Sequence, residues 1–532
     1  MRIAAPVSRI MVHALPIAFV VISWFAAAGF PYYLDSNETF LSYMHARNLE
    51  IWNPWEYAWL TAEATDAQLQ SIDRFYTHNP NGPRYLHYLL LRVGVQDLSA
   101  HVLILSVLGA GLTGFLLWRL FGQPALAVVA LAVVCDYAGF LSWTVNTYRI
   151  WSFVLYFGLM LAAVKRRPVW FGALMFLLFQ IEYGFALFAG VASGLMALFL
   201  YGRRSWPLIL AAGVGSVLSV GLFAAQVLAF YGWDGFLHEL TVTYARRGTE
   251  GQAAGGLRYV YQAWHGPIAL LNIIARETHN VAVLILVNGG VVWSILALRR
   301  VGASETQRFL ARLTLSAGIG IVTSSMVLYG YFVNGFVDSL LPIATFLVAP
   351  ALGVVAIELH RLLSQFWSSP HVRTLSAAVV LVPLIAGSIG HFRPPVGVGL
   401  FERLQGELRG QNIIAPNLGA FHSNPELAFA LAGGRAFRTS DVDATPEDVR
   451  RFESLRAPDG TLTYFCLDTM YLRQIHRPGA GNACDVAVSR MVPRGHTIVA
   501  DGFGWAILQV NRESETPTAT EQPADFGQVV AR

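Results

Sequence analysis

Long apolar runs, separated by short polar or basic segments, dominate this chain. The runs lie at residues 10–30, 100–118, 124–141, 150–164, 169–200, 207–230, 281–298, 309–331, 337–357 and 375–389. Most are close to the roughly 20 residues that a helix needs to cross a hydrocarbon core of about 30 Å. The pattern predicts a polytopic α-helical membrane protein.

Basic clusters between the runs predict their orientation, because Lys and Arg near span ends favour the cytoplasmic side. The run 169–200 is flanked by two such clusters, so it must enter the membrane and return. Its polar break at 180–184 predicts two short helices that meet there. The count becomes about eleven spans, with the N-terminus cytoplasmic and the C-terminus outside. The clusters are Arg119; Lys165, Arg166 and Arg167; Arg203 and Arg204; Arg299, Arg300 and Arg308; and Arg361 with Arg373.

Composition agrees with a membrane protein and argues against one class of partner. Charged residues make up 13% of the 532 residues, against about 25% in soluble domains. The net charge of +4 is small, and no basic run is interleaved with aromatic residues, so nucleic acid is not an expected partner. Arg2 and Arg9 precede the first apolar run, whose length favours a retained anchor over a cleaved signal peptide.

Three regions are expected from the same pattern. Residues 1–391 form the transmembrane domain, with external loops at 35–99 and 231–280. Residues 392–512 carry more charge and short strand-like strings at 412–415 and 463–465, with a helical stretch at 446–455. We interpret them as a small α/β domain outside the membrane. The tail, residues 513–532, has a composition typical of disorder.

The loop 35–99 mixes apolar and polar residues in short runs. This favours short amphipathic helices on the membrane surface, with Trp52, Trp55 and Trp59 at headgroup depth. Ordinary packing within a surface loop explains any single Trp equally well.

An acidic motif, Asp35-Ser36-Asn37-Glu38, directly follows the first apolar run. Carboxylates at the mouth of a span are costly unless they are solvated, paired or used in function. We therefore expect them to face a water-filled cavity, where Asp35, nearest the span, serves as a general base. Glu38 shares a helix face with Asp35 if a helix begins there. The alternative is that these residues only cap that helix.

The same loop closes with Thr77-His78-Asn79-Pro80, followed by an apolar stretch. With these two motifs the chain resembles the GT-C superfamily of membrane glycosyltransferases, which includes protein O-mannosyltransferases and the lipid A aminoarabinose transferases. Its members share an acidic motif after the first span, a long external loop, and a His-Pro-Pro-like turn. Here Asn79 replaces the more usual Pro. The resemblance in architecture covers the N-terminal two thirds of the chain.

The resemblance implies an enzyme of the bacterial inner membrane, with its C-terminal domain in the periplasm. Such enzymes pass a sugar from a polyprenyl-phosphate carrier to an external acceptor, which is a lipid, a polysaccharide or a protein. The acceptor hydroxyl needs a base, and the leaving phosphate needs positive charge. Candidates for binding substrate or phosphate are His78, Arg84, His87, Arg149, Arg246, Arg247 and Arg258. Ordinary solvated charge is the alternative for each Arg.

Glu182 is the acidic residue within the run 169–200. A carboxylate in an apolar run is expected to be paired or to face a cavity. It either orients a sugar hydroxyl or neutralises a neighbouring cation such as Arg149.

No cofactor is firmly implied. The histidines and cysteines lack metal-site spacing, although Asp35 and Glu38 could together hold Mg²⁺ or Mn²⁺ against a phosphate. The chain has no P-loop or dinucleotide fingerprint, so a nucleotide-sugar donor is not expected. Cys466 and Cys484 either form a disulfide, as an oxidising periplasm favours, or remain two thiols.

Two other classes of function remain open. A transporter or flippase of a lipid-linked glycan would also be polytopic, but such proteins often carry internal repeats and polar residues at the membrane midplane. This chain has no convincing repeat, and its polar groups lie near one face. A non-catalytic scaffold subunit with the same fold is the third class.

Overall fold

A computed structural model gives the fold of the chain. It divides the chain into two compact units, Met1–Thr65 with Ser71–Arg403, and Asp66–Gln70 with Leu404–Arg532. The structure describes residues 21, 37–51, 53–65, 72–75, 81–121, 147–247, 281–327, 341–367, 371–372, 375–376, 378–380, 382–383, 406–407, 413–415, 436–438, 462–467, 497–502 and 505–510.

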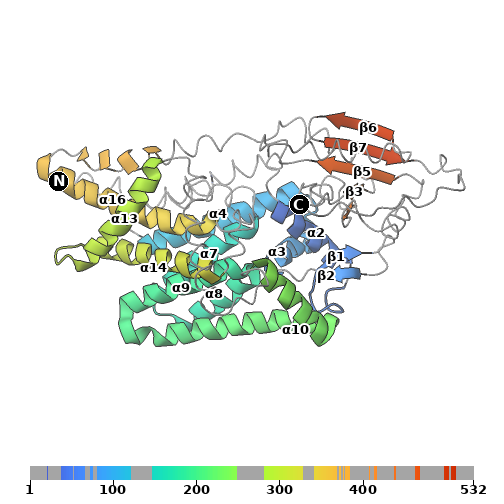
Figure 1. The fold of residues 1–532 in the computed structure, drawn as a ribbon, viewed down its shortest axis with the longest axis horizontal. Helices are drawn as coiled ribbons and strands as arrows, with labels where there is room; N and C mark the ends of the chain where they lie inside the picture. Colours follow the sequence, from blue (N-terminus) through green and yellow to red (C-terminus); the bar gives the residue numbers. More distant parts are fainter. Residues whose placement is uncertain are drawn as a thin grey trace, which may run out of the picture. The chain divides into compact units, whose positions relative to one another are not determined.

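The first unit is mostly helical where it is described (Figure 1). Two short strands, β1 (Ala62–Thr65) and β2 (Ile72–Phe75), pair antiparallel within the predicted first loop. The helices are α2 (Asn37–Ile51), α3 (Gly82–Arg92), α4 (Leu98–Phe121), α7 (Thr147–Val164), α8 (Pro168–Ile181), α9 (Tyr183–Tyr201), the 3₁₀ turn η2 (Gly202–Ser205), α10 (Trp206–Arg247), α13 (Val281–Arg299), α14 (Glu305–Val327) and α16 (Leu341–Phe366).

Several of these helices are suited to a bilayer. Two shorter apolar helices, Ile150–Val164 and Pro168–Ile181, accompany five described segments that are long and apolar enough to cross a membrane. A mostly helical multi-pass membrane protein is thus confirmed. The count of about eleven spans and the orientation of the termini stay predictions, because the run 124–141 and all of the run 10–30 except Val21 lie outside the described residues. The five segments are Leu98–Leu120, Tyr183–His238, Ala282–Arg299, Glu305–Val327 and Thr345–Phe366.

The run 169–200 forms the predicted pair of helices. Glu182 separates α8 from α9 with an extended backbone, φ −156° and ψ 123°. The start of α8 and the end of α9, both remote from Glu182, lie close together. Tyr201, at the end of α9, donates a hydrogen bond to the Val164 carbonyl at 2.6 Å, and Arg166 Nη2 donates to the Arg204 carbonyl at 3.3 Å. The chain therefore reverses its direction at Glu182, and the basic clusters at 165–167 and 203–204 lie at the same end of the bundle.

Small residues let α8 and α10 approach closely. A Cβ atom at Gly215 would lie 2.1 Å from the Gly172 carbonyl oxygen, so no larger residue fits without a backbone shift. Gln180 Nε2 adds a hydrogen bond to Ser219 Oγ at 2.8 Å. Close packing and interhelical hydrogen bonds are the main attractions between helices in lipid, where the hydrophobic effect contributes little.

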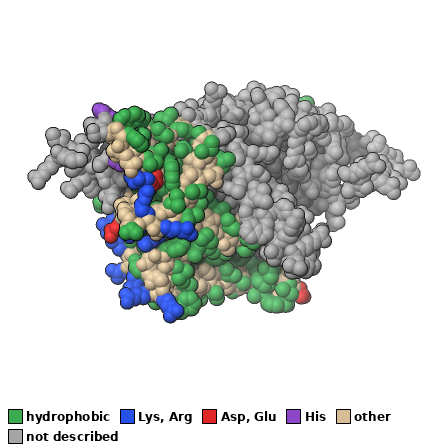
Figure 2. Space-filling view, turned by 60° about the vertical axis from the view of Figure 1, so that its left-hand side comes forward, with side chains coloured by type: hydrophobic (Ala, Val, Ile, Leu, Met, Phe, Trp, Pro, Cys, Tyr) green, Lys and Arg blue, Asp and Glu red, His purple; other side chains and the backbone are tan. Residues whose placement is uncertain are grey.

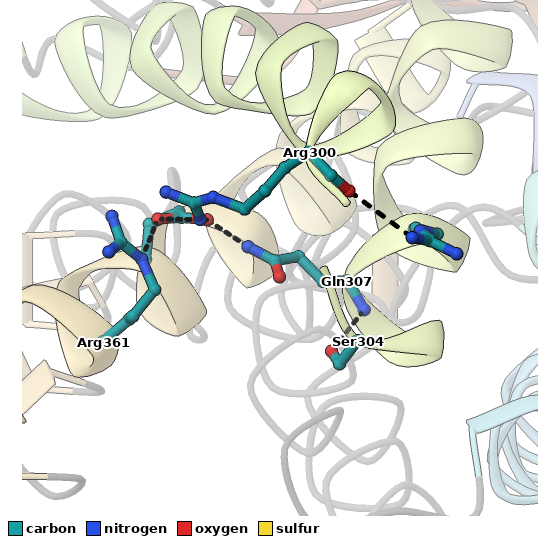
Figure 3. Close-up of polar contacts among 6 residues, drawn as sticks. Arg300, Ser304, Gln307 and Arg361 are labelled. Carbon is teal, nitrogen blue, oxygen red and sulfur yellow. Dashed lines mark hydrogen bonds and ion pairs between the residues drawn. The ribbon is translucent and has the colours of Figure 1, made fainter. Parts of the chain in front are cut away.

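Helices α13, α14 and α16 are joined by a buried carboxylate (Figure 3). Glu358, 3% exposed, accepts hydrogen bonds from Arg300 Nη1 at 3.1 Å and from Arg361 Nε at 2.8 Å, and also from the Gln307 amide. Two cations and an amide compensate the buried negative charge, whose desolvation would otherwise be costly. Arg300, predicted only as a topology signal, therefore also links the end of α13 to α16, while Arg361, another such signal, compensates Glu358 from within α16.

Helix α2 differs from the expected surface helix. Five consecutive side chains, from Ser42 to Ala46, are buried and together cover every side of the helix, while Glu50 near its end is exposed. A helix on a membrane surface would expose one face to water. The expectation is wrong for α2 because other elements cover it, including α3. Trp55 is exposed, whereas Trp59 packs edge-on against Tyr85 and Tyr88.

The second unit contains a five-stranded sheet in the order β4-β3-β5-β7-β6. Strand β3 is parallel to β4 and β5, and β7 is antiparallel to β5 and β6. Residues 413–415 of the predicted string 412–415 form β3, the string 463–465 lies in β5, and the helical stretch 446–455 lies outside the described residues. The boundaries 392–512 and the disordered tail 513–532 stay predictions. The strands are β3 (Ile413–Ala415), β4 (Ala436–Arg438), β5 (Leu462–Leu467), β6 (Thr497–Gly502) and β7 (Trp505–Val510).

Candidate functional site

Glu182 forms an elbow between α8 and α9. Its backbone N–H donates to the Leu178 carbonyl at 3.1 Å, and its own carbonyl accepts from Ala186 N–H at 2.9 Å, so it ends one helix and begins the next. The residue is 6% exposed. Helix α8 has 14 residues, which place the elbow about 21 Å from the basic turn that precedes it. The carboxylate thus lies toward the opposite end of these helices.

The segment after the His-Pro motif reaches this elbow. Helix α3 begins at Gly82, where a Cβ atom would lie 2.5 Å from the Gln180 carbonyl oxygen. Only glycine fits this contact without a shift of the backbone. Arg84 follows Gly82 by two residues, and Glu182 follows Gln180 by two residues. Arg84 and Glu182, which lie about 100 residues apart in the sequence, are therefore brought to the same corner of the bundle.

A buried polar network surrounds the first turn of α3. Asn81 and Arg84 are 1% and 2% exposed. The Asn81 Oδ1 atom accepts a hydrogen bond from Thr61 Oγ1 at 3.0 Å and another from Arg84 Nη1. Because the carbonyl oxygen of the Asn81 side chain faces both donors, it fixes the guanidinium of Arg84 relative to the 53–61 loop. We call Thr61, Asn81, Gly82, Arg84, Gln180 and Glu182 the elbow site.

Two further bonds hold the 53–61 loop on this corner. Tyr85 OH donates to the Trp59 carbonyl at 2.8 Å, and Gln226 Nε2, from α10, donates to the Ala58 carbonyl at 2.7 Å. Burial raises the pKa of Tyr85 above its ordinary value, which keeps the phenol protonated as a donor. Ala58 and Trp59 have left-handed backbones, with φ 47° and 63°. The loop is thus held in a strained conformation by side chains from α3 and α10.

Apart from His87, the predicted site residues and cysteines fall into three groups. Arg84 and Glu182 are described with their side chains and belong to the elbow site. Of Glu38, Arg149, Arg246 and Arg247, the structure describes the helix backbone, in α2, α7 and α10, and Cys466 lies in β5. Asp35, His78, Arg258 and Cys484 lie outside the described residues, so their roles and the disulfide stay predictions.

The directions of α2 and α7 show where Glu38 and Arg149 lie along their helices, although only the backbone of these two residues is described. Glu38 lies in the first turn of α2, which begins at Asn37. Helix α7 has 18 residues and ends beside the basic turn at 165–167, so Arg149 near its start lies about 24 Å from that turn. Helix α7 packs against α8 and α9. The start of α7 thus lies toward the same end of the bundle as the elbow.

Sequence reasoning missed Thr61, Asn81 and Gln226. Asn81 directly follows the Thr77-His78-Asn79-Pro80 motif, so its position next to Pro80 was a usable signal. Thr61 and Gln226 carry no local pattern that distinguishes them from other polar residues. Their roles follow only from contacts across 20 and 168 positions of the chain.

His87 lies in a different environment from the one predicted. It is fully buried and stacks on His101 of α4, with ring centroids 5.3 Å apart. His101 Nε2 lies 2.8 Å from the Val95 carbonyl oxygen and must carry a proton there. His101 Nδ1 is then an acceptor, and His87 Nδ1 donates to it across 3.0 Å. Burial lowers the pKa of His87 to about 3, so a neutral imidazole joins α3 to α4.

We expect acid to destabilise the fold through His87. The ordinary pKa of 6.5 falls to about 3 in the folded chain. Between these values the unfolded chain binds a proton that the folded chain does not, so stability falls as pH decreases from 6.5 toward 3. The loss by pH 5 is about 2 kcal/mol. Thermal unfolding in detergent at pH 7 and pH 5 measures it.

The control for this prediction is His238, an exposed histidine of α10. His87→Asn keeps a donor toward His101 but removes the titrating group, so its unfolding midpoint changes less between pH 7 and pH 5. His238→Asn leaves the pH dependence as in the unaltered chain. An unchanged pH dependence in His87→Asn would show that His87 does not carry this effect.

Metal binding has no support among the described side chains. No group of three or more His, Cys, Asp or Glu residues stands close enough there to hold an ion. The predicted alternative, Mg²⁺ or Mn²⁺ at Asp35 and Glu38, concerns side chains outside this description.

Comparison with known proteins finds similarity to solved structures only. No protein-family model and no curated protein matches the chain. The crystal structure of ArnT from Cupriavidus metallidurans in the apo state aligns over 93% of this chain and 97% of that one, with 14% identity and a TM-score of 0.45. At this identity and TM-score, what the chain does has to follow from its own residues.

Proposed function

We propose that this protein is a GT-C-type membrane glycosyltransferase. It takes a sugar from a polyprenyl-phosphate carrier and passes it to an acceptor outside the cytoplasmic membrane. The observation that carries the proposal is the contact of Gly82 with Gln180. It joins the segment after the His-Pro motif to the buried elbow that holds Glu182, at the end of the bundle opposite the basic turns.

The acidic motif supplies the base in this mechanism. An acceptor hydroxyl has too high a pKa to attack unaided, so a carboxylate takes its proton as the new bond to the anomeric carbon forms. Asp35 has this role, with Glu38 three residues further on in the first turn of α2. The bond between the anomeric carbon and the carrier phosphate breaks, and the phosphate leaves with the bonding electrons.

Cationic side chains stabilise the departing phosphate. Its negative charge grows in the transition state, and guanidinium groups offer paired donors to phosphate oxygens. Arg84 is fixed by Asn81 at the elbow site. Arg149, Arg246, Arg247 and Arg258 are the further proposed contacts, and Glu182 either orients a sugar hydroxyl or balances one of these cations. An apolar environment strengthens each of these interactions.

Arginine substitutions test the phosphate site. We expect Arg149→Ala, and at least one of Arg246→Ala, Arg247→Ala and Arg258→Ala, to lose about 3 kcal/mol of transition-state stabilisation, or roughly 100-fold in rate. The loss arises because one charge-assisted contact to the leaving group disappears. Transfer from a polyprenyl-phosphate-linked sugar by the purified chain, reconstituted in liposomes, measures the rate.

Arg92 provides the matched control. It is an exposed arginine in the last turn of α3, outside the elbow site, and Arg92→Ala is expected to transfer sugar at the rate of the unaltered chain. Unreduced transfer in all four site variants would rule out the proposed phosphate site. Mass spectrometry of lipid-linked sugars and envelope glycans, in cells with and without the protein, then identifies donor and acceptor.

A further inference from the structure

Two turns at one end of the helix bundle bring five cations together. Lys165, Arg166 and Arg167 form the turn between α7 and α8, and Arg203 and Arg204 lie in η2. Arg166 joins the turns: its Nη2 atom donates to the Arg204 carbonyl at 3.3 Å, and its guanidinium lies 5.1 Å from the Tyr201 ring centroid. All five side chains are exposed. We call these five residues the basic corner; Figure 2 shows Lys and Arg gathered at one edge of the described face.

Acidic residues are scarce in the sequence around these five cations. In the part of the chain that the structure describes, none of the five forms an ion pair, whereas Arg300 and Arg361 both pair with Glu358. Between Asp136 and Asp234 the sequence contains one acidic residue, Glu182, and it lies at the far end of α8, about 21 Å away. Uncompensated charge of one sign creates a local potential that attracts anions.

The backbone of Arg166 adds an independent observation. Its φ is +49°, in the left-handed region where glycine is favoured. The bonds Arg166 N–H to the Ala163 carbonyl and Arg167 N–H to the Ala162 carbonyl, at 3.0 and 2.9 Å, form a Schellman motif that ends α7. Glycine is the common residue at this position. An arginine at this position costs conformational free energy, but it gives the turn a third consecutive cation. A functional role of that side chain would explain the cost.

Exposed apolar side chains border the basic corner. Val169 and Trp170 open α8 at 81% and 67% exposure, and Trp206 opens α10 at 65%. Tryptophan is enriched at the level of lipid headgroups, where its ring meets both apolar chains and water. Leu177 and Leu210 continue the exposed apolar surface along the same two helices. The five cations thus lie where the lipid-facing surface of the bundle ends.

We propose that the basic corner binds an anionic phospholipid with two phosphates in its headgroup, such as cardiolipin. Each turn supplies at least two cations, and Arg presents paired N–H donors to phosphate oxygens. Two adjoining turns therefore match two linked phosphates, while Trp170 and Trp206 contact the glycerol and upper acyl region. This site is separate from the proposed transferase site, which lies at the other end of α8 and α9.

Lipid titration of the purified full chain in detergent micelles tests the inference. Native mass spectrometry counts bound lipid for cardiolipin, phosphatidylglycerol and phosphatidylcholine. We expect cardiolipin to bind tightest, phosphatidylcholine not to bind specifically, and added salt to weaken binding. Arg166→Gly and Arg204→Gln each lower cardiolipin affinity about fivefold. Arg166→Gly also relieves the left-handed backbone, so its unfolding midpoint stays at or above that of the unaltered chain.

Arg299→Gln is the matched control, because Arg299 is an exposed arginine at the end of α13, outside the basic corner. It should leave cardiolipin affinity unchanged. An equal loss in Arg299→Gln would show a diffuse field instead of a site and would overturn the proposal. Equal binding of cardiolipin and phosphatidylcholine would do the same, as would displacement of cardiolipin by millimolar inorganic phosphate, which would identify a site for a free anion.

Discussion

Asp35→Asn is expected to abolish sugar transfer while membrane insertion and donor binding persist. The substitution keeps the shape of the side chain and removes its charge and basicity. General-base catalysis contributes about 10²–10⁴ in rate, or roughly 3–5 kcal/mol. If Asp35 only capped α2, which begins two residues later, Asn would cap almost as well and transfer would barely change. Single-turnover transfer with saturating donor measures the chemical step.

Glu38→Gln, run beside Asp35→Asn, identifies which carboxylate is the base. Loss in Glu38→Gln with full activity in Asp35→Asn would move the role to Glu38. Full activity in both variants would remove the mechanism proposed here and favour a flippase or a scaffold. Donor binding, measured separately, distinguishes a lost base from a lost site.

Gly82→Ala is expected to lower both stability and transfer. The new Cβ atom would stand 2.5 Å from the Gln180 carbonyl oxygen and 3.0 Å from its carbonyl carbon. These are backbone atoms of α8, so α3 must move. Overpacking of this kind costs about 1–3 kcal/mol. A displacement of 1 Å at a reacting site can reduce the rate by about 10²-fold, and Asn81 and Arg84 move with α3.

Gly194→Ala is the control for this substitution. Gly194 lies in α9, and a Cβ atom there meets nothing within 4 Å. Alanine is a better helix former by about 1 kcal/mol, so stability is expected to hold or rise while transfer is unchanged. A Gly82→Ala variant as stable and as active as the unaltered chain would mean that α3 does not need its contact with the elbow.

Several elements were readable from local sequence because their causes are local. The run 169–200 is too long for one span and carries basic residues at both ends, so its reversal at Glu182 followed from charge and length. The strings in β3 and β5 are short, apolar and bounded by turn residues. Glu182 was singled out because a carboxylate within an apolar run is costly unless it is paired or faces a cavity, and Arg84 because it lies beside the His-Pro motif and could bind phosphate.

Other features depend on which distant segments meet. Helix α2 looks like a surface helix by its mixed sequence, yet it is buried because other elements cover its sides. The position of His87 beside the His-Pro motif suggests a phosphate ligand. In the fold its Nδ1 atom donates to His101 instead, and burial keeps its imidazole neutral. Nothing local predicts the approach of Gly82 to Gln180 or the pairing of Arg300 with Glu358, whereas Arg361 and Glu358 are i,i+3 neighbours within α16. Sequence pattern determines where helices form and which ends carry charge, since both follow from transfer of side chains and backbone into lipid. The partners of each buried polar group are decided only when the helices pack, because a hydrogen bond requires two specific atoms within about 3 Å.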